Sequence, residues 1–431
     1  MEIKNVKGGY DYLPNKQNIR DYINDILKDT FKEYGYLSVE TPILCYYDML
    51  SGKYDENSDI LSEIYKLKDQ GNRKLGLRYD LTVPFAKLIA LNKNEIKFPF
   101  KRYEINKVFR DGPVKVGRDR EFTQCDVDVV GLSGELIEAE LLSLYVSAFN
   151  KLKIDIVIKY NNRKLMKGLI LDCGIEEELV SRVITILDKF EKITKKELVN
   201  MLISIGVNTN KTQLLYKIFD LSLEELNQKF KTTKNSLIYE GLKEINNLND
   251  ISKKLGICSI QFSPTLARGQ DYYTGNVFEV YEKNYKLSSS IGGGGRYDNM
   301  ITEFIDDGKE YPAVGISFGL TGIYELLKTR TINNSIDIYL IPINTEIYTL
   351  KLANNLRKLG IKVDINMNSK KLKRSIDYAY KENIKYIIII GEDEVNAESF
   401  VLKNIQTKEE YKISMSDIEK IKSIVSKYMI I

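Results

Sequence analysis

Apolar side chains recur at helical spacing near the start of the chain. Between residues 17 and 34 they lie three or four positions apart, and Gly35 ends the pattern, which predicts an amphipathic helix. Residues 36–44 have the character of an extended segment and contain Pro42. Because proline has no N–H to give to a neighbouring strand, we expect this strand at the edge of a sheet or at an interface.

Six further segments have the pattern of strands, and a helical stretch interrupts them. The strand-like segments are residues 98–110, 122–131, 153–160, 259–264, 276–281 and 288–297. Between the third and the fourth, residues from about 165 to 256 are charged and show helical periodicity. Strands, then helices, then strands predict an α+β domain with a mainly antiparallel sheet and a helical insertion.

The last hundred residues alternate between strand and helix patterns. The expected elements are a strand at 336–342, a helix at 345–359, a strand at 361–365, a helix at 369–383 and a strand at 386–391. Such alternation is typical of an α/β domain with a partly parallel sheet. The polar stretch 329–335 has no pattern and is interpreted as a linker. We therefore expect one domain at 1–328 and a second at 335–431.

The composition excludes several kinds of active site. The 431 residues include no histidine, which rules out Ser-His-Asp and Cys-His nucleophiles, HExxH zinc sites and histidine bases. The four cysteines lie far apart in the sequence. This spacing argues against a zinc ribbon or a disulfide framework and fits a reducing compartment.

The charge balance is close to even, with 64 Lys and Arg against 60 Asp and Glu. A polyanion would therefore bind to local basic patches. One such cluster is Lys370, Lys371, Lys373 and Arg374, which could contact an RNA backbone or form a solvated helix face. There is no 18-residue apolar run and no signal-peptide pattern. We expect a cytoplasmic protein that does not enter a membrane.

The segment 100–131 combines a basic loop with a polar strand face. Arg110 ends one strand pattern, and alternation in the next places Phe122, Gln124, Asp126 and Asp128 on one face. Polar side chains along a half-buried face indicate a binding surface. A solvent-facing strand next to an ordinary basic turn is the alternative.

Two more segments carry candidate chemistry. Residues 266–280 contain Arg268, Asp271, Tyr272 and Tyr273; arginine is a common clamp for carboxylates and phosphates, although tyrosine-rich strands also occur in cores. The four glycines in 291–300 match neither GxxxxGK[ST] nor GxGxxG. They favour a ligand lying on a sheet over a phosphate loop.

Taken together, these segments resemble histidyl-tRNA synthetase, a class II aminoacyl-tRNA synthetase. The similar stretches are KGGYDYLP (7–14), motif 1 with Pro42, RYDLTVPFAK (78–87), motif 2 at 100–131 in a eukaryote-like form, LARGQDYYTG, GGRYD and NSKKLKRSIDYA (368–379). The resemblance implies a class II catalytic domain, a C-terminal anticodon-binding domain and a homodimer.

The implied activity is that of a histidine–tRNA ligase. Histidine and ATP, with Mg²⁺, would give histidyl-adenylate, and histidine would then pass to the 3′ end of tRNA(His). By resemblance, the catalytic residues are Arg110 and Arg268, and no metal ligand is implied. The residues implied for histidine are Asp80, Thr82, Arg110, Gln124, Asp128, Arg268, Tyr272 and Tyr273. Those implied for ATP are Arg110, Arg118, Glu121 and Phe122.

Motif 3 departs from the family pattern. Thr321 and Gly322 stand where a Glu-Arg pair belongs, and in motif 2 Asp111 directly follows Arg110. A histidine-binding regulatory or re-purposed paralogue without full aminoacylation activity is therefore an alternative, as is aminoacylation of another carrier. The absence of histidine would allow synthesis during histidine starvation, or it reflects compositional drift; the sequence leaves both open.

Overall fold

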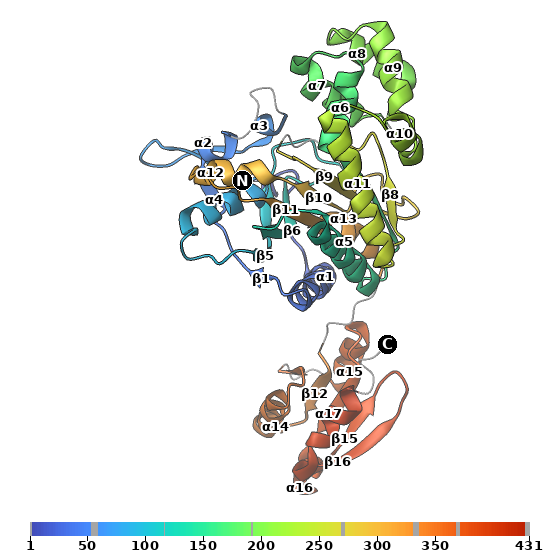
Figure 1. Cartoon of the computed structure of the whole chain (residues 1–431). Coiled ribbons are helices and arrows are strands. Elements are labelled where there is room, and N and C mark those ends of the chain that lie inside the picture. The colour runs from blue at the N-terminus through green and yellow to red at the C-terminus, as the bar shows by residue number, and fades with distance from the viewer. Residues whose placement is uncertain are drawn as a thin grey trace. The chain divides into compact units, whose positions relative to one another are not determined.

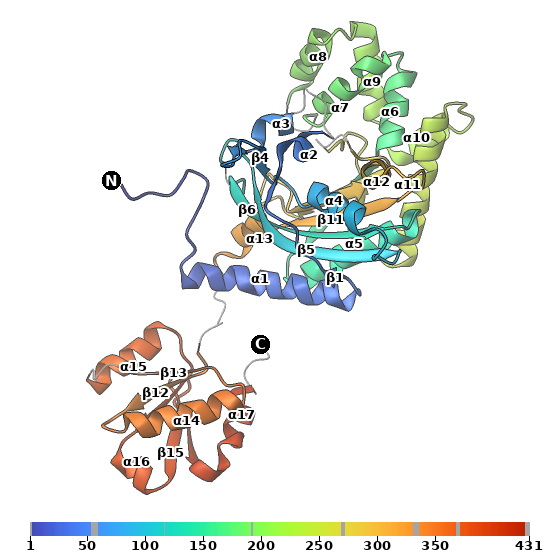
Figure 2. The same cartoon turned by 90° about the vertical axis from the view of Figure 1, so that its left-hand side faces the viewer.

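The computed structural model describes residues 2–52, 59–115, 117–190, 193–268, 272–330, 336–367 and 371–426 (Figures 1 and 2). The chain divides into two compact units, Met1–Arg330 and Thr331–Ile431. Asp271, Lys370 and most of the expected linker lie outside the described residues. Within the described ranges, no helix is long and apolar enough to cross a membrane.

An eight-stranded sheet forms the centre of the first unit. Its strands are β1 (Leu37–Ser38), β5 (Phe100–Phe109), β6 (Glu121–Val130), β7 (Ile156–Asn162), β8 (Ile260–Phe262), β9 (Asn276–Glu282), β10 (Gly292–Arg296) and β11 (Ala313–Gly319). The order is β1-β5-β6-β11-β10-β9-β7-β8. Pairing is antiparallel except at the two edges, where β1 is parallel to β5 and β8 to β7. The predicted mainly antiparallel sheet is confirmed, and β1 is an edge strand.

The sequence patterns missed part of this strand architecture. β11 was not predicted, because its sequence AVGISFG is rich in small residues with little strand preference; it pairs with both β6 and β10. The extended stretch 36–44 contains only β1 and the start of β2. A separate small sheet has the order β2-β4-β3, made of Leu44–Tyr46, Lys74–Leu77 and Lys66–Lys68.

Seven helices outside the insertion pack around the sheets of the first unit in its described residues. They are α1 (Pro14–Glu33), α2 (Tyr47–Ser51), α3 (Asp59–Glu63), α4 (Thr82–Asn92), α5 (Glu135–Lys151), α12 (Asp298–Ile305) and α13 (Leu320–Leu327). α1 confirms the first predicted helix, and it begins at Pro14 because the first helical turn needs no N–H there. α1 packs on α5 and α13, whereas α4 packs on α12.

The predicted helical insertion is present between β7 and β8. Its helices are α6 (Arg163–Asp172), α7 (Val180–Leu187), α8 (Lys195–Ser204), α9 (Thr209–Phe219), α10 (Leu223–Lys229) and α11 (Ser236–Lys254). In both views α8 and α9 lie at the top of the first unit (Figures 1 and 2). Thr194 and Ser222 form capping boxes that begin α8 and α10.

The second unit has its own sheet and core. The strands are β12 (Ile338–Pro342), β13 (Val363–Ile365), β14 (Tyr386–Ile390), β15 (Ser399–Asn404) and β16 (Glu410–Ser414), in the order β13-β12-β14-β15-β16. The helices are α14 (Glu346–Lys358), α15 (Leu372–Lys381), α16 (Glu392–Asn396) and α17 (Glu419–Ser426). The alternation of strand and helix from β12 to β14 is confirmed, and β15 and β16 are antiparallel additions that were not predicted.

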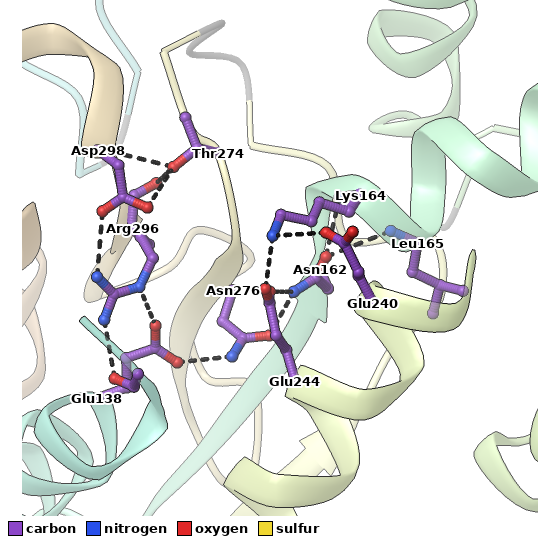
Figure 3. Close-up of polar contacts among 11 residues, drawn as sticks. Glu138, Asn162, Lys164, Leu165, Glu240, Glu244, Thr274, Asn276, Arg296 and Asp298 are labelled. Atoms are coloured by element: carbon purple, nitrogen blue, oxygen red, sulfur yellow. Dashed lines mark hydrogen bonds and ion pairs between the residues drawn. The ribbon is translucent and has the colours of Figure 1, made fainter. Parts of the chain in front are cut away.

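A buried polar network joins the sheet of the first unit to its insertion (Figure 3). Glu138 of α5 accepts hydrogen bonds from Arg296 Nε of β10 and from Asn276 Nδ2 of β9, each at 2.6 Å. Asn276 Oδ1 in turn accepts from Asn162 at 2.9 Å, and Asn162 also donates to Glu244 of α11 at 2.6 Å. Burial raises the pKa of Glu138 to about 6, although Arg296 lowers it. The network fixes β9 and β10 against α5 and α11.

Replacing Glu138 by alanine should destabilise the first unit, because Arg296 would remain buried without its carboxylate. We expect Glu138→Ala to lower the free energy of unfolding by about 3–5 kcal/mol. Glu140→Ala, on the same helix but in a partly exposed pair with Lys101, should lower it by about 1 kcal/mol or less. Urea unfolding followed by circular dichroism measures the free energy of unfolding of both variants. Equal losses would contradict the stabilising role given to the buried Glu138–Arg296 pair.

Candidate active site on the antiparallel sheet

A cavity of about 680 Å³ lies over the middle strands of the first unit. Of the site residues expected from the sequence, those that line it are Asp80, Thr82, Arg110, Arg118, Phe122, Gln124, Asp128, Arg268, Tyr272 and Tyr273. Segments more than 180 residues apart in the sequence therefore meet at one cavity. Glu121 is the expected residue that does not line it.

The alternation of β6 explains this division. Phe122, Gln124, Asp126 and Asp128 all point into the cavity. Glu121 begins the same strand on the opposite face, where its carboxylate pairs with Lys107. Since successive side chains of a strand point to opposite faces, Glu121 cannot share the cavity with Phe122.

Asp128 is held at the floor of the cavity by two partners. Arg102 of β5 stands opposite it in the sheet, and the guanidinium lies 2.7 Å from Asp128 Oδ2. The Tyr297 hydroxyl donates to Asp128 Oδ1 at 2.5 Å. Burial lowers the pKa of Arg102, but Asp128 and the nearby carboxylates outweigh this, so the pKa of Arg102 is raised. The sequence patterns missed Arg102, whose signal is a charged residue inside an otherwise half-buried strand.

A second buried ion pair lies beside the first. Arg78 donates to Glu104 at 3.1 Å and to the Thr41 carbonyl at 2.5 Å, and the Thr41 backbone N–H donates to Glu104 at 3.0 Å. These bonds tie the segment before α4 to the loop after β1. Asp80 is thereby brought to the cavity wall, where it accepts from the Val83 N–H at 3.1 Å. Burial raises the pKa of Asp80 to about 6, although its backbone hydrogen bonds and Arg110 oppose this.

Two arginines of motif 2 lie on the cavity wall. Arg110 donates from Nε to the Tyr79 carbonyl at 3.1 Å, and its guanidinium lies 5.1 Å from the centre of the Phe122 ring. Arg118 is half exposed and pairs with Glu63 at 2.6 Å. An aromatic face and fixed cations are suited to a purine base and its phosphates.

Arg268 lies on the sheet itself. Its guanidinium is 3.2 Å from Glu279 and 5.8 Å from the Tyr273 ring centre. Its φ of 57° is rare for a side chain other than glycine, and such strain is common at functional sites. A Cβ at Gly293 would overlap the guanidinium. Gly293 therefore makes room for Arg268. Gly292, Gly293 and Gly294 also line the cavity, so a ligand lying on this strand stays a prediction.

Gly315 of β11 serves Asp128 in the same way. It stands opposite Asp128 in the sheet, and a Cβ there would overlap the Asp128 carboxylate. By contrast, a Cβ at Gly319, at the end of the same strand, would meet its nearest neighbour, the Ile291 carbonyl, at 3.5 Å. No sequence pattern indicates this role, because it depends on the register between β6 and β11.

The altered motif 3 residues begin α13 and do not line the cavity. Both Thr321 and Gly322 are buried, and a Cβ at Gly322 would lie 3.2 Å from the Ile291 side chain. Burial raises the pKa of Asp119 in motif 2, while the nearby Thr321 side chain and the charge of Arg20 oppose this. Thr321 therefore contacts the motif 2 loop.

Comparison with known proteins identifies the family. A sequence model described as histidyl-tRNA synthetase matches residues 8–323, and one described as an anticodon binding domain matches residues 337–423. The chain belongs to the histidyl-tRNA synthetase family. The resemblance inferred from the motifs and the class II fold that it implied are confirmed.

Relatives in this family match along nearly the whole chain. A Bacillus cereus protein named "Histidine--tRNA ligase 1" is 46% identical over 97% of this chain and 99% of its own length. A Shouchella clausii protein named "Histidine--tRNA ligase 2" is 42% identical over 96% and 99%. The crystal structure of histidyl-tRNA synthetase from Nostoc sp. PCC 7120 superposes with a TM-score of 0.86 at 28% identity, covering 100% of both chains.

The two glycines of β11 allow a paired test of whether Gly315 leaves space for the Asp128 carboxylate. Gly315→Ala should displace the Asp128 carboxylate and raise the KM for histidine about tenfold or more, since it disturbs a charge-assisted hydrogen bond. Gly319→Ala should change it less than about twofold, because its Cβ makes only an ordinary contact. Initial rates against histidine concentration measure both variants. Equal KM values for Gly315→Ala and the unchanged chain would contradict the role given to Gly315.

Proposed function

We propose that this chain is a histidine–tRNA ligase, which activates histidine with ATP and transfers it to the 3′ end of tRNA(His). The observation that carries the proposal is the shared cavity, in which the cations Arg110 and Arg268 lie with the buried acceptor Asp128. Family membership and the names of the full-length relatives support it. No relative described above supports the regulatory alternative.

The chemistry of the first step suits a chain without histidine. The carboxylate of the substrate is ionised at neutral pH and attacks the α-phosphorus of ATP without a protein base. Charge builds up on the phosphoryl oxygens, and fixed cations stabilise it. We assign this role to Arg110 and Arg268, and the distal phosphates to Arg118 once it leaves Glu63.

Recognition of the amino acid is assigned to the acidic side of the cavity. We propose that Asp80 and Thr82 hold the α-amino group and that Gln124, Tyr272 and Tyr273 surround the ring. Asp128, fixed by Arg102 and Tyr297, accepts a hydrogen bond from a ring N–H. A buried acceptor of this kind rejects an amino acid without that N–H, because the carboxylate would remain unpaired.

ATP is the nucleotide used by this family, and Mg²⁺ is part of the proposal. The residues that the structure describes contain no cluster of three His, Cys, Asp or Glu side chains able to hold a metal. Mg²⁺ usually keeps several waters and binds through nucleotide phosphates. We therefore propose that Mg²⁺ enters the site together with ATP.

The partner of the second step is proposed to be tRNA(His), bound in part by the second unit. Residues 337–423 match an anticodon binding domain. Lys371, Lys373 and Arg374 at the start of α15 are exposed, which an RNA contact requires and a solvated helix face would also show. Since tRNA charging in bacteria takes place in the cytoplasm, we propose that location.

Replacing Arg268 by alanine tests the catalytic assignment. Removing a fixed cation that meets the developing charge should reduce histidine-dependent ATP–pyrophosphate exchange by about a hundredfold or more. Arg73→Ala, which removes an exposed arginine paired with Asp69 outside this cavity, is the control and should keep most of the exchange. Exchange retained in Arg268→Ala would refute the role of Arg268, and exchange with another amino acid in the unchanged chain would refute the function.

The homodimer is also a proposal, and exposed apolar residues support it. Leu37, Leu44 and Tyr46 of the motif 1 region are 62%, 50% and 58% exposed. We infer that they meet a second copy of the chain, because exposure of large apolar side chains to water is unfavourable. Sedimentation should give the mass of a dimer for the unchanged chain and of a monomer for Leu44→Asp. Leu91→Asp, at a 75% exposed site of α4, should remain dimeric. A monomeric unchanged chain would overturn the proposal.

A further inference from the structure

One carboxyl group on the cavity floor has no role in the function proposed so far. Asp126 lies two positions before Asp128 on β6, lines the same cavity and is 4% exposed. Gln124 Nε2 approaches its Oδ1 at 3.5 Å, and the Ser317 hydroxyl of β11 also interacts with it. Its surroundings therefore supply only neutral donors at close range.

The nearest charges are already engaged with other groups. Arg102 is 2.7 Å from Asp128 and 3.7 Å from Glu104, and Arg78 pairs with Glu104. Among the described residues, no cation lies within ion-pair distance of Asp126. The charged and titratable groups around Asp126 are Arg102 and Glu104 on β5, Cys125 and Asp128 on β6, Asp80 before α4, Tyr297 after β10 and Tyr145 on α5. Glu104 stands directly opposite Asp126 in the sheet.

The balance of these charges favours a proton on Asp126. Burial raises the pKa of Asp126 to about 7, Arg102 lowers it, and Asp128 raises it further. In a chain without histidine, a buried carboxyl is thus a group that titrates near neutral pH. It can present an O–H donor to the cavity, which an ionised carboxylate cannot do.

The substrate ring offers a matching acceptor. A neutral imidazole has one N–H and one bare nitrogen. Asp128 accepts from the N–H in the proposed function, and the bare nitrogen then needs a donor. Asp126 projects from the same strand face as Asp128, about 7 Å further along the strand at the usual rise per residue, so both carboxyls can reach one ring from two sides.

We propose that Asp126 is a second carboxyl of the histidine site, which binds the ring nitrogen opposite the one bound by Asp128 through a single shared proton. The proton stays on the carboxyl and bonds to the bare nitrogen, or it moves to the ring and the ring N–H bonds to the carboxylate. Both arrangements contain one proton and one hydrogen bond. This inference rests on the proposed function insofar as histidine occupies the cavity.

The shared proton makes histidine binding depend on pH. Above the pKa of Asp126, the free site and the free neutral ring together lack one proton, so binding must take one from solution. The Kd for histidine should then rise by up to about tenfold per pH unit above neutral. Without that proton, a carboxylate faces a bare nitrogen and the two lone pairs repel.

Asp126→Asn separates this role from a structural one. The asparagine amide has nearly the same shape and donates an N–H to the bare nitrogen at every pH. Calorimetric titration of the full chain with histidine from pH 6.5 to 8.5 should show a rising Kd for the unchanged chain and a change below about twofold for Asp126→Asn. In buffers of different ionisation enthalpy at pH 8, the unchanged chain should take up about one proton per histidine and the variant none.

A second carboxyl with a raised pKa provides the matched control. Burial raises the pKa of Asp119, which is half-buried and does not line the cavity, so Asp119→Asn should keep both the pH dependence and the proton uptake. A flat Kd in the unchanged chain, or the same pH dependence in Asp126→Asn, would overturn the proposal. So would loss of the pH dependence in Asp119→Asn.

A second measurement covers the case in which the variant does not fold. If Asp126→Asn fails to fold, nitrogen NMR of ring-labelled histidine bound to the unchanged chain replaces it: hydrogen bonds at both nitrogens support the proposal, and the resonance of a bare nitrogen refutes it. Calorimetry needs no adenylate. A chain that binds histidine but shows no ATP–pyrophosphate exchange would therefore refute the ligase function while Asp126 could still be judged by its proton uptake.

Discussion

The burial of charge beneath a polar cavity is the constraint on which this structure depends. Arg78, Arg102, Glu104 and Asp128 are almost inaccessible to solvent, and an unpaired ion in such a place would be strongly destabilising. Each is held by partners from other segments: β5 supplies Arg102 and Glu104, β6 supplies Asp128, and the stretch before α4 supplies Arg78. The charges therefore stabilise the fold only when these segments are all in register, and the same register aims Asp128 at the substrate.

The glycines of β10 and β11 are the steric counterpart of that electrostatic constraint. Gly293 leaves room for the Arg268 guanidinium, and Gly315 leaves room for the Asp128 carboxylate. Glycine within a strand weakens it, because it adds backbone entropy and contributes no side-chain packing. Here the neighbouring long side chains occupy the space, so the sheet remains packed while two charged groups lie flat against it.

Features that depend on residues close together in the sequence could be predicted, whereas features that depend on distant segments could not. Local periodicity predicted α1, the insertion and the alternation from β12 to β14, because each reflects side chains close in sequence. The strand alternation of β6 placed Phe122, Gln124, Asp126 and Asp128 on one face. The roles of Arg102 and Gly315 could not be predicted, since they follow from pairing between strands distant in the chain, as does the formation of β11. The motif resemblance implied that Glu121 binds ATP. The alternation of β6, however, places Glu121 on the strand face opposite to Phe122.

The order of strands has a consequence for how the chain is made. β6 pairs with β11, and about 180 residues of insertion and further strands separate them along the chain. During synthesis, β6 must therefore wait with one edge unpaired until β11 emerges, whereas the helices of the insertion can form from local contacts. Exposed strand edges invite pairing with other chains, and charged side chains discourage it. The carboxyls of β6 would thus protect the nascent sheet from aggregation before they bind the substrate in the folded protein.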